Sequence, residues 1–98
     1  MKLGINGFGR IGRAIFKINQ EHGFFDVVGI NDIDNAENMA YLLRYDSTYG
    51  RFDKEVKTSD GKLQIGEKVI KHDSSSEIEN IEWIDEVDVI IDATGISS

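Results

Sequence analysis

Three glycines near the start of the chain have the spacing of a loop that binds phosphate. Gly7, Gly9 and Gly12 form the pattern G-x-G-x-x-G within GINGFGRIGRAI, residues 4–15. In such a loop the first glycine allows a tight turn, the second lets the backbone approach a pyrophosphate, and the third lets a helix pack closely against a sheet. The start of that helix attracts the anion through free N–H groups and a partial positive charge. Because glycine makes up 10 of the 98 residues, the pattern needs support from its surroundings.

An acidic residue at a suitable distance gives that support. Asp32 follows Gly12 by 20 positions and comes at the end of the second predicted strand. A carboxylate there accepts hydrogen bonds from both ribose hydroxyls and repels a 2′-phosphate, which favours NAD over NADP. The alternative is a structural turn in which Asp32 only caps a helix. The strand, the helix and the acid together favour the dinucleotide.

Other ionisable side chains have simpler interpretations. Arg10 and Arg13 could contact phosphate or could equally be solvated or subunit-contact residues. His22 lies at a predicted helix end, where positive charge is favourable, so a catalytic role is not expected. His72 ends a strand and belongs either to an exposed loop or to the wall of an adenine pocket. Packing is expected of Trp83, Tyr41, Tyr45 and Tyr49, and a solvated face rather than a metal site of Glu77, Glu79 and Glu82.

Composition limits the functional class. There is no cysteine, so these residues supply no thiol nucleophile, disulfide or thiolate zinc site. The net charge of −7 argues against nucleic acid or an anionic membrane as partner. No apolar run is long enough to cross a bilayer and no signal peptide is recognised, so we expect one cytoplasmic domain over residues 1–98.

The first half of the chain predicts a strand, a helix, a strand and a second helix. Residues 2–6 form an apolar strand, residues 10–22 a helix that Gly23 ends, and residues 26–31 a β-branched strand. Asn35 is expected to cap the second helix. The predicted buried stripes are Ile11, Ala14, Ile15 and Ile18 in the first helix and Ala36, Met39, Ala40 and Leu43 in the second.

The second half predicts mainly strands. Gly66-Glu67 separates two β-rich runs and suggests a hairpin. The remaining elements are a structured loop at 45–52, a strand at EVKT, a polar loop at 74–80, a short helical turn around 81–84, and the strand VDVIID at 87–92, which we expect to be covered on both faces.

These elements predict an incomplete Rossmann-type α/β fold, a doubly wound parallel sheet with a hairpin insertion. Its first crossover is right-handed, and its fourth parallel strand lies beside the first, opposite the second. This order places Thr94 and Gly95 next to the glycine loop, at the point where such folds bind ligands.

Four blocks of sequence resemble one enzyme family. INGFGRIGR (5–13), GIND (29–32), YLLRYDSTYGRF (41–52) and DVIIDATG (88–95) match, in order and spacing, the N-terminal part of the glyceraldehyde-3-phosphate dehydrogenases. The erythrose-4-phosphate dehydrogenases resemble the same blocks. The resemblance spans almost the whole chain and implies an NAD-binding segment of an enzyme that oxidises and phosphorylates an aldose phosphate in glycolysis.

The resemblance also implies roles for individual residues. Backbone groups around Gly9, Arg10 and Ile11 would hold the pyrophosphate, and Asp32, with Asn31, the adenosine. The cofactor-binding residues expected on this basis are Gly7, Phe8, Gly9, Arg10, Ile11, Gly12, Asn31, Asp32, His72, Thr94 and Gly95. The parent enzyme would be a homotetramer, and self-association of this chain is expected.

Three departures accompany the resemblance. Lys71-His72 stand where the family has an acidic-basic pair near the adenine, and Tyr49 replaces a usual histidine. The cysteine that attacks the aldehyde to form a thiohemiacetal, and the histidine that activates it, have no match here. We therefore expect a catalytic domain outside these residues and no activity from the 98 residues alone. The rival hypothesis is a non-catalytic nucleotide-binding module that partners a separate catalytic chain.

Overall fold

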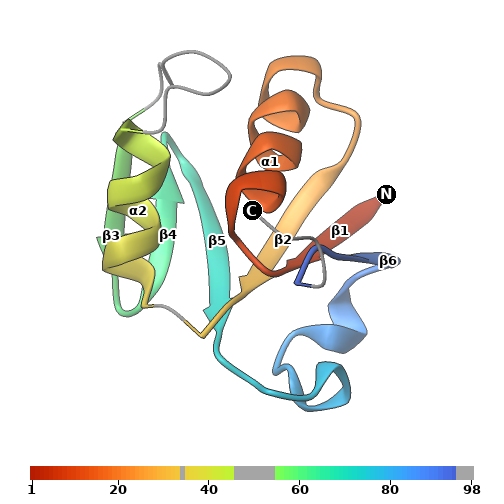
Figure 1. The fold of residues 1–98 in the computed structure, drawn as a ribbon. Coiled ribbons are helices and arrows are strands. Elements are labelled where there is room, and N and C mark those ends of the chain that lie inside the picture. The colour runs from red at the N-terminus through yellow and green to blue at the C-terminus, as the bar shows by residue number, and fades with distance from the viewer. Residues whose placement is uncertain (34, 46–54, 95–98) are drawn as a thin grey trace.

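The computed structural model describes residues 1–33, 35–45 and 55–94 (Figure 1). Most of the 45–52 block, including Tyr49, lies outside the described residues, as does Gly95. The elements are β1 (Lys2–Asn6), α1 (Arg10–His22), β2 (Asp26–Asn31), α2 (Ala36–Tyr45), β3 (Val56–Ser59), β4 (Lys62–Ile65), β5 (Lys68–Asp73), the 3₁₀ turns η1 (Ile78–Asn80) and η2 (Ile84–Glu86), and β6 (Val89–Asp92).

One sheet of six strands organises the described chain, in the order β3-β4-β5-β2-β1-β6. β5, β2, β1 and β6 run parallel, and β3 and β4 extend the sheet as antiparallel strands. The predicted hairpin at Gly66-Glu67 is confirmed, and Asp60-Gly61 forms a second tight turn with φ of 53° and 75°. The fourth parallel strand lies beside the first, opposite β2, as the Rossmann-type order requires.

Both helices cover the same face of the sheet (Figure 1). Their buried side chains share one apolar core with residues of β1, β2, β4 and β5. The predicted stripe of α2 is confirmed, since Ala36, Met39, Ala40 and Leu43 are all buried. Asn35 caps this helix, because its side-chain oxygen accepts a hydrogen bond from the Asn38 N–H at 2.7 Å.

The predicted stripe of α1 is only partly confirmed. Ile18 is 45% exposed, and Ile11 and Ile15 are only partly buried. The buried face instead contains Gly12 and Phe16, one turn apart. Gly12 lets the helix approach the β1–α1 loop more closely than any side chain could, and with Gly12 on the buried face Ile18 points to solvent. Ala14 is buried, as predicted.

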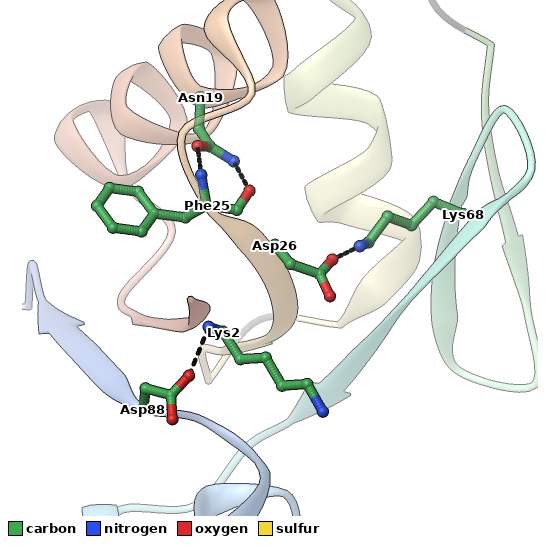
Figure 2. A network of polar contacts seen from close by, with 6 residues as sticks. All are labelled: Lys2, Asn19, Phe25, Asp26, Lys68 and Asp88. Carbon is green, nitrogen blue, oxygen red and sulfur yellow. Dashed lines mark hydrogen bonds and ion pairs between the residues drawn. The ribbon is translucent and has the colours of Figure 1, made fainter.

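A buried polar side chain fixes the end of α1. The Asn19 amide donates to the Phe25 carbonyl at 2.8 Å, and its oxygen accepts the Phe25 N–H at 2.7 Å (Figure 2). Gly23 adopts the left-handed conformation that ends many helices, as predicted. The turn into β2 is therefore held by a side chain that no apolar pattern would reveal.

The other face of the sheet is covered in part by the segment between β5 and β6. Trp83 is 1% exposed and its indole ring lies against Gly4 of β1 and Gly29 of β2. A Cβ at either glycine would approach the ring to 2.5 Å or less. The helical turn expected around residues 81–84 is displaced, because the 3₁₀ turns are η1 and η2 on either side of Trp83. The tryptophan packs, as predicted.

β6 departs from the prediction that VDVIID is covered on both faces. The strand is shorter, Val89 is 40% exposed, and Ile90 and Ile91 are only partly buried. β6 is an edge strand whose one described neighbour is β1. The apolar run is typical of an internal parallel strand, but no described element covers its outer side.

Candidate functional site

The carboxyl ends of three parallel strands bring most of the candidate residues together. Asn6 ends β1 and Gly7 follows it, Asn31 ends β2 and Asp32 follows it, and Thr94 lies just after β6. Thr94 lies against the glycine loop, because a Cβ at Gly7 would be 2.8 Å from the Thr94 methyl carbon. The structure thus places Thr94 where the strand order predicts it.

The three glycines differ in what surrounds them. Gly7 has a φ of 98°, which only glycine adopts readily. A Cβ at Gly12 would lie 2.2 Å from the Gly7 carbonyl oxygen, so this position has no room for a side chain. A Cβ at Gly9 would meet no heavy atom within 4 Å. Gly7 and Gly12 are needed by the fold itself, whereas the space beside Gly9 is open.

Asp32 is tied to the glycine loop. Its carboxylate accepts a hydrogen bond from the Phe8 N–H at 2.6 Å. The Gly7 N–H donates to the Asn31 carbonyl at 2.7 Å, so the loop is held to the end of β2 at two points. The Phe8 side chain lies in the core and packs edge-on against Phe16, with ring centroids 5.8 Å apart. Phe8 can therefore offer a ligand only its backbone.

The two arginines of α1 lie in different settings. The Arg13 guanidinium donates to the Phe8 carbonyl at 3.0 Å, which closes the loop from the helix side. Arg10 is exposed at the first position of the helix. Arg13 thus has a structural contact in the loop, and Arg10 is the arginine more open to a phosphate or to another protein.

Two buried asparagines link the strand ends, and sequence reasoning did not foresee their contact. Asn6 and Asn31 are 8% and 4% exposed. The Asn31 amide donates to the Asn6 side-chain oxygen at 2.8 Å and to the Ser75 carbonyl at 3.0 Å. The Ser75 N–H donates back to Asn31 at 2.9 Å. The parallel register of β1 and β2 pairs Asn6 with Asn31, so knowing that these two strands are neighbours would have revealed the contact.

The network continues toward β6. The Asn6 amide lies 3.4 Å from an Asp92 carboxylate oxygen, which also accepts the Thr94 hydroxyl at 2.6 Å and the Thr94 N–H at 3.1 Å. The hydrogen bonds from the Thr94 side chain and backbone hold the pKa of Asp92 below its ordinary value of 3.8. Asp92 is therefore ionised at neutral pH and fixes Thr94 beside the loop.

Asp73 organises the opposite end of the network. Its carboxylate accepts the Glu82 N–H at 2.8 Å, the Ser74 N–H at 2.9 Å and the Ser75 hydroxyl at 3.0 Å. Burial raises the pKa of Asp73, but these hydrogen bonds outweigh burial and lower the pKa below its ordinary 3.8. The nearby His72 imidazole lowers it further. An ionised Asp73 thus holds the segment that leads from β5 to Trp83.

The Lys71-His72 pair lies inside β5. His72 is level with Ile30 of β2 and shares the helix-covered face with it. Lys71 points to the other face, where its amine contacts the Glu86 carboxylate at 2.7 Å. Asp73 and Ser75 come nearer to Asn31 than Lys71 does. Adenine contact by His72 stays a prediction.

Alternative kinds of site find little support in the described ranges. His22 is exposed and stacks on Phe24 at 5.3 Å between ring centroids. Within residues 1–33, 35–45 and 55–94, no three histidine or acidic side chains gather as metal ligands would. The helices of this part of the chain are too short or too polar to span a membrane.

The residues present fit a dinucleotide. The first N–H groups of an α-helix have no partner within the helix, and those of α1 follow directly after the open position at Gly9. Asp32 lies at the neighbouring strand end with its carboxylate held in place. This arrangement suits a pyrophosphate at the helix start and a ribose at the carboxylate.

Comparison with known proteins agrees with this geometry. The family model described as glyceraldehyde 3-phosphate dehydrogenase, NAD binding domain, matches residues 1–98. Glyceraldehyde-3-phosphate dehydrogenase of Salmonella typhimurium is 49% identical over 98 residues, and that of Haemophilus influenzae 46% over 97 residues. Glyceraldehyde-3-phosphate dehydrogenase A of Escherichia coli K12 is 47% identical over 98 residues.

These alignments cover 98% of this chain and 29% of each relative, so the chain spans under a third of their length. The match of the cofactor-binding domain from residue 1 to residue 98 decides between the two hypotheses of the sequence analysis in favour of a dehydrogenase segment. The chain belongs to the glyceraldehyde-3-phosphate dehydrogenase family, and it is an NAD-binding domain of that family.

Proposed function

We propose that NAD lies across the carboxyl ends of β2, β1 and β6. The pyrophosphate lies over Gly9 and the backbone of Arg10 and Ile11, and the adenosine ribose lies at Asp32. Thr94, beside the glycine loop, lines the cofactor crevice. The observation that supports this placement is the open space at Gly9, between two glycines whose positions leave no room for a side chain.

The chain's own groups have defined tasks in this arrangement. The Phe8 N–H fixes one carboxylate oxygen of Asp32, which orients the acid before the ribose arrives. The N–H groups at the start of α1 neutralise the pyrophosphate charge. The negative charge of Asp32 disfavours a 2′-phosphate and so selects NAD over NADP.

Replacing Asp32 tests the ribose assignment. Asp32→Asn keeps the shape of the side chain but removes the charge. We expect NAD affinity to fall at least about tenfold, which corresponds to about 1.4 kcal/mol, and the preference for NAD over NADP to narrow. Isothermal titration calorimetry with each dinucleotide measures both quantities.

The matched control is Asp85→Asn, which removes an exposed carboxylate in η2. This variant should bind NAD as the wild type does. If Asp32→Asn bound NAD with wild-type affinity and selectivity, the ribose assignment would be wrong.

We further propose that the complete enzyme oxidises an aldose phosphate and transfers the acyl group to phosphate. When bound, NAD would accept the hydride. The 98 residues contain no cysteine, so the thiol that attacks the aldehyde must come from protein outside them. A homotetrameric, cytoplasmic enzyme with neither nucleic acid nor membrane as partner fits the family and the net charge of −7.

A further inference from the structure

The glycine loop begins with the chain's one Asn-Gly sequence, Asn6-Gly7. Asparagine followed by glycine is the sequence most prone to spontaneous deamidation, because glycine has no side chain to hinder attack by its own nitrogen. The structure shows both reacting groups engaged in hydrogen bonds. We propose that Asn6 is a deamidation site that the folded strand ends keep unreactive, and that separation of the carboxyl ends of β1 and β2 exposes it.

The chemistry needs only water. The Gly7 nitrogen loses its proton and attacks the side-chain carbonyl carbon of Asn6, the bond to Nδ2 breaks, and ammonia leaves. The resulting five-membered succinimide then adds water at either carbonyl and opens to aspartate or to isoaspartate. No oxidant, reductant or enzyme takes part.

The nucleophile, the Gly7 nitrogen, is engaged in a backbone hydrogen bond. The Gly7 N–H donates to the Asn31 carbonyl at 2.7 Å, and Gly7 is buried between the strand end and Thr94. An amide N–H in such a bond does not meet hydroxide until the bond opens, as hydrogen exchange of buried amides illustrates. Reaction at Gly7 therefore requires separation of the loop from β2.

The electrophile, the Asn6 side-chain amide, is held by contacts from both neighbouring strands. Asn6 is the last residue of β1 and is 8% exposed. Its side-chain oxygen accepts the Asn31 amide at 2.8 Å and its nitrogen lies 3.4 Å from Asp92. A side chain held from both neighbouring strands cannot turn toward the Gly7 nitrogen without breaking these contacts.

The products would damage the site that contains them. Aspartate at position 6 replaces the amide donor with a carboxylate facing the Asp92 carboxylate, and like charges at this separation repel. Isoaspartate inserts an extra carbon into the main chain directly before Gly7, which alters the tight turn of the glycine loop. Modification at Asn6 would thus also prevent the strand ends from closing again.

Peptide mapping by mass spectrometry tests the proposal on the full chain. The protein is kept at mildly alkaline pH, natively and in urea, and the mass gain at Asn6 is followed with time. We expect the native rate to be at least about tenfold below the rate in urea, because reaction follows the population of the open form. Equal rates in native buffer and in urea would overturn the proposal.

Two variants test whether the Asn31 side chain slows the deamidation of Asn6. Asn31→Ala removes the amide that holds Asn6 but keeps the carbonyl that accepts the Gly7 N–H, so native deamidation at Asn6 should accelerate severalfold. Asn38→Ala, at an exposed position of α2, should leave the rate unchanged. Circular dichroism confirms that each variant is folded. A folded Asn31→Ala protein that modifies Asn6 at the wild-type rate would contradict the role given to the asparagine contact.

Discussion

At the scale of single residues, the three glycines of one motif serve different needs. Gly7 and Gly12 are required by the backbone, through a positive φ and through contact with a carbonyl oxygen. Gly9 has a φ of −79°, which any residue adopts, and an open side. The sequence motif does not distinguish the three glycines. Their packing shows that Gly7 and Gly12 are required by the fold and that Gly9 is the one with open space for a ligand.

This difference predicts that alanine destabilises the fold much more at position 12 than at position 9. Gly12→Ala should lower the free energy of unfolding by about 1 to 3 kcal/mol, because the new methyl group collides with the Gly7 carbonyl. Gly9→Ala should cost under about 1 kcal/mol, since it changes only the residue that precedes α1. Urea unfolding followed by circular dichroism measures both. Equal losses in the two variants would show that the loop packs differently from this structure.

Residue types and their spacing single out the acid and the glycines but not the asparagine network. Asp32 stands out because its distance from the motif is typical of a ribose-binding acid, and its ribose role stays a prediction. Asn6 and Asn31 are polar residues that end apolar strands, and without the strand register nothing in the sequence pairs them. Their contact depends on β1 and β2 lying side by side in parallel, so it emerges only in the folded sheet.

At the scale of elements, the strand order and the second helix were predictable, whereas the rotation of α1 was not. Apolar periodicity identifies a helix and its stripe, but here one close backbone contact at Gly12 outweighs several isoleucines. The path of the segment between β5 and β6 also does not follow from apolar spacing, because hydrogen bonds to Asp73 hold this segment in place.

The Asp73 contacts predict how acid affects that segment. A carboxyl group whose folded pKa lies below its ordinary 3.8 stabilises the fold at pH values above 3.8, and this contribution is lost as pH falls through the folded pKa. Asp73→Asn should therefore cost about 1 to 3 kcal/mol at pH 7 and progressively less below pH 4.

Denaturant unfolding of wild type and Asp73→Asn between pH 7 and pH 3 checks this expectation. Asp85→Asn, at an exposed position of η2, serves as the control and should track the wild type. A difference between wild type and Asp73→Asn that stayed constant over this range would show that the charge of Asp73 does not stabilise the segment.

At the scale of the whole molecule, one edge of the sheet is apolar and open. Among the described elements β6 pairs only with β1, and Val89 is 40% exposed. Exposed apolar edge strands invite pairing with another chain. We predict that the 98-residue protein self-associates as its concentration rises. Light scattering over a wide concentration range measures this, and a constant monomer mass throughout would contradict it.

The most direct test of the account is thermal unfolding in the presence of NAD. A ligand that binds only the folded state raises Tm as its concentration increases. We predict a rising Tm for the wild type and a much smaller rise for Gly9→Ala, whose methyl group occupies the open space at the loop. A wild-type Tm unmoved by millimolar NAD would contradict the proposed site, and so would an equal rise in both proteins.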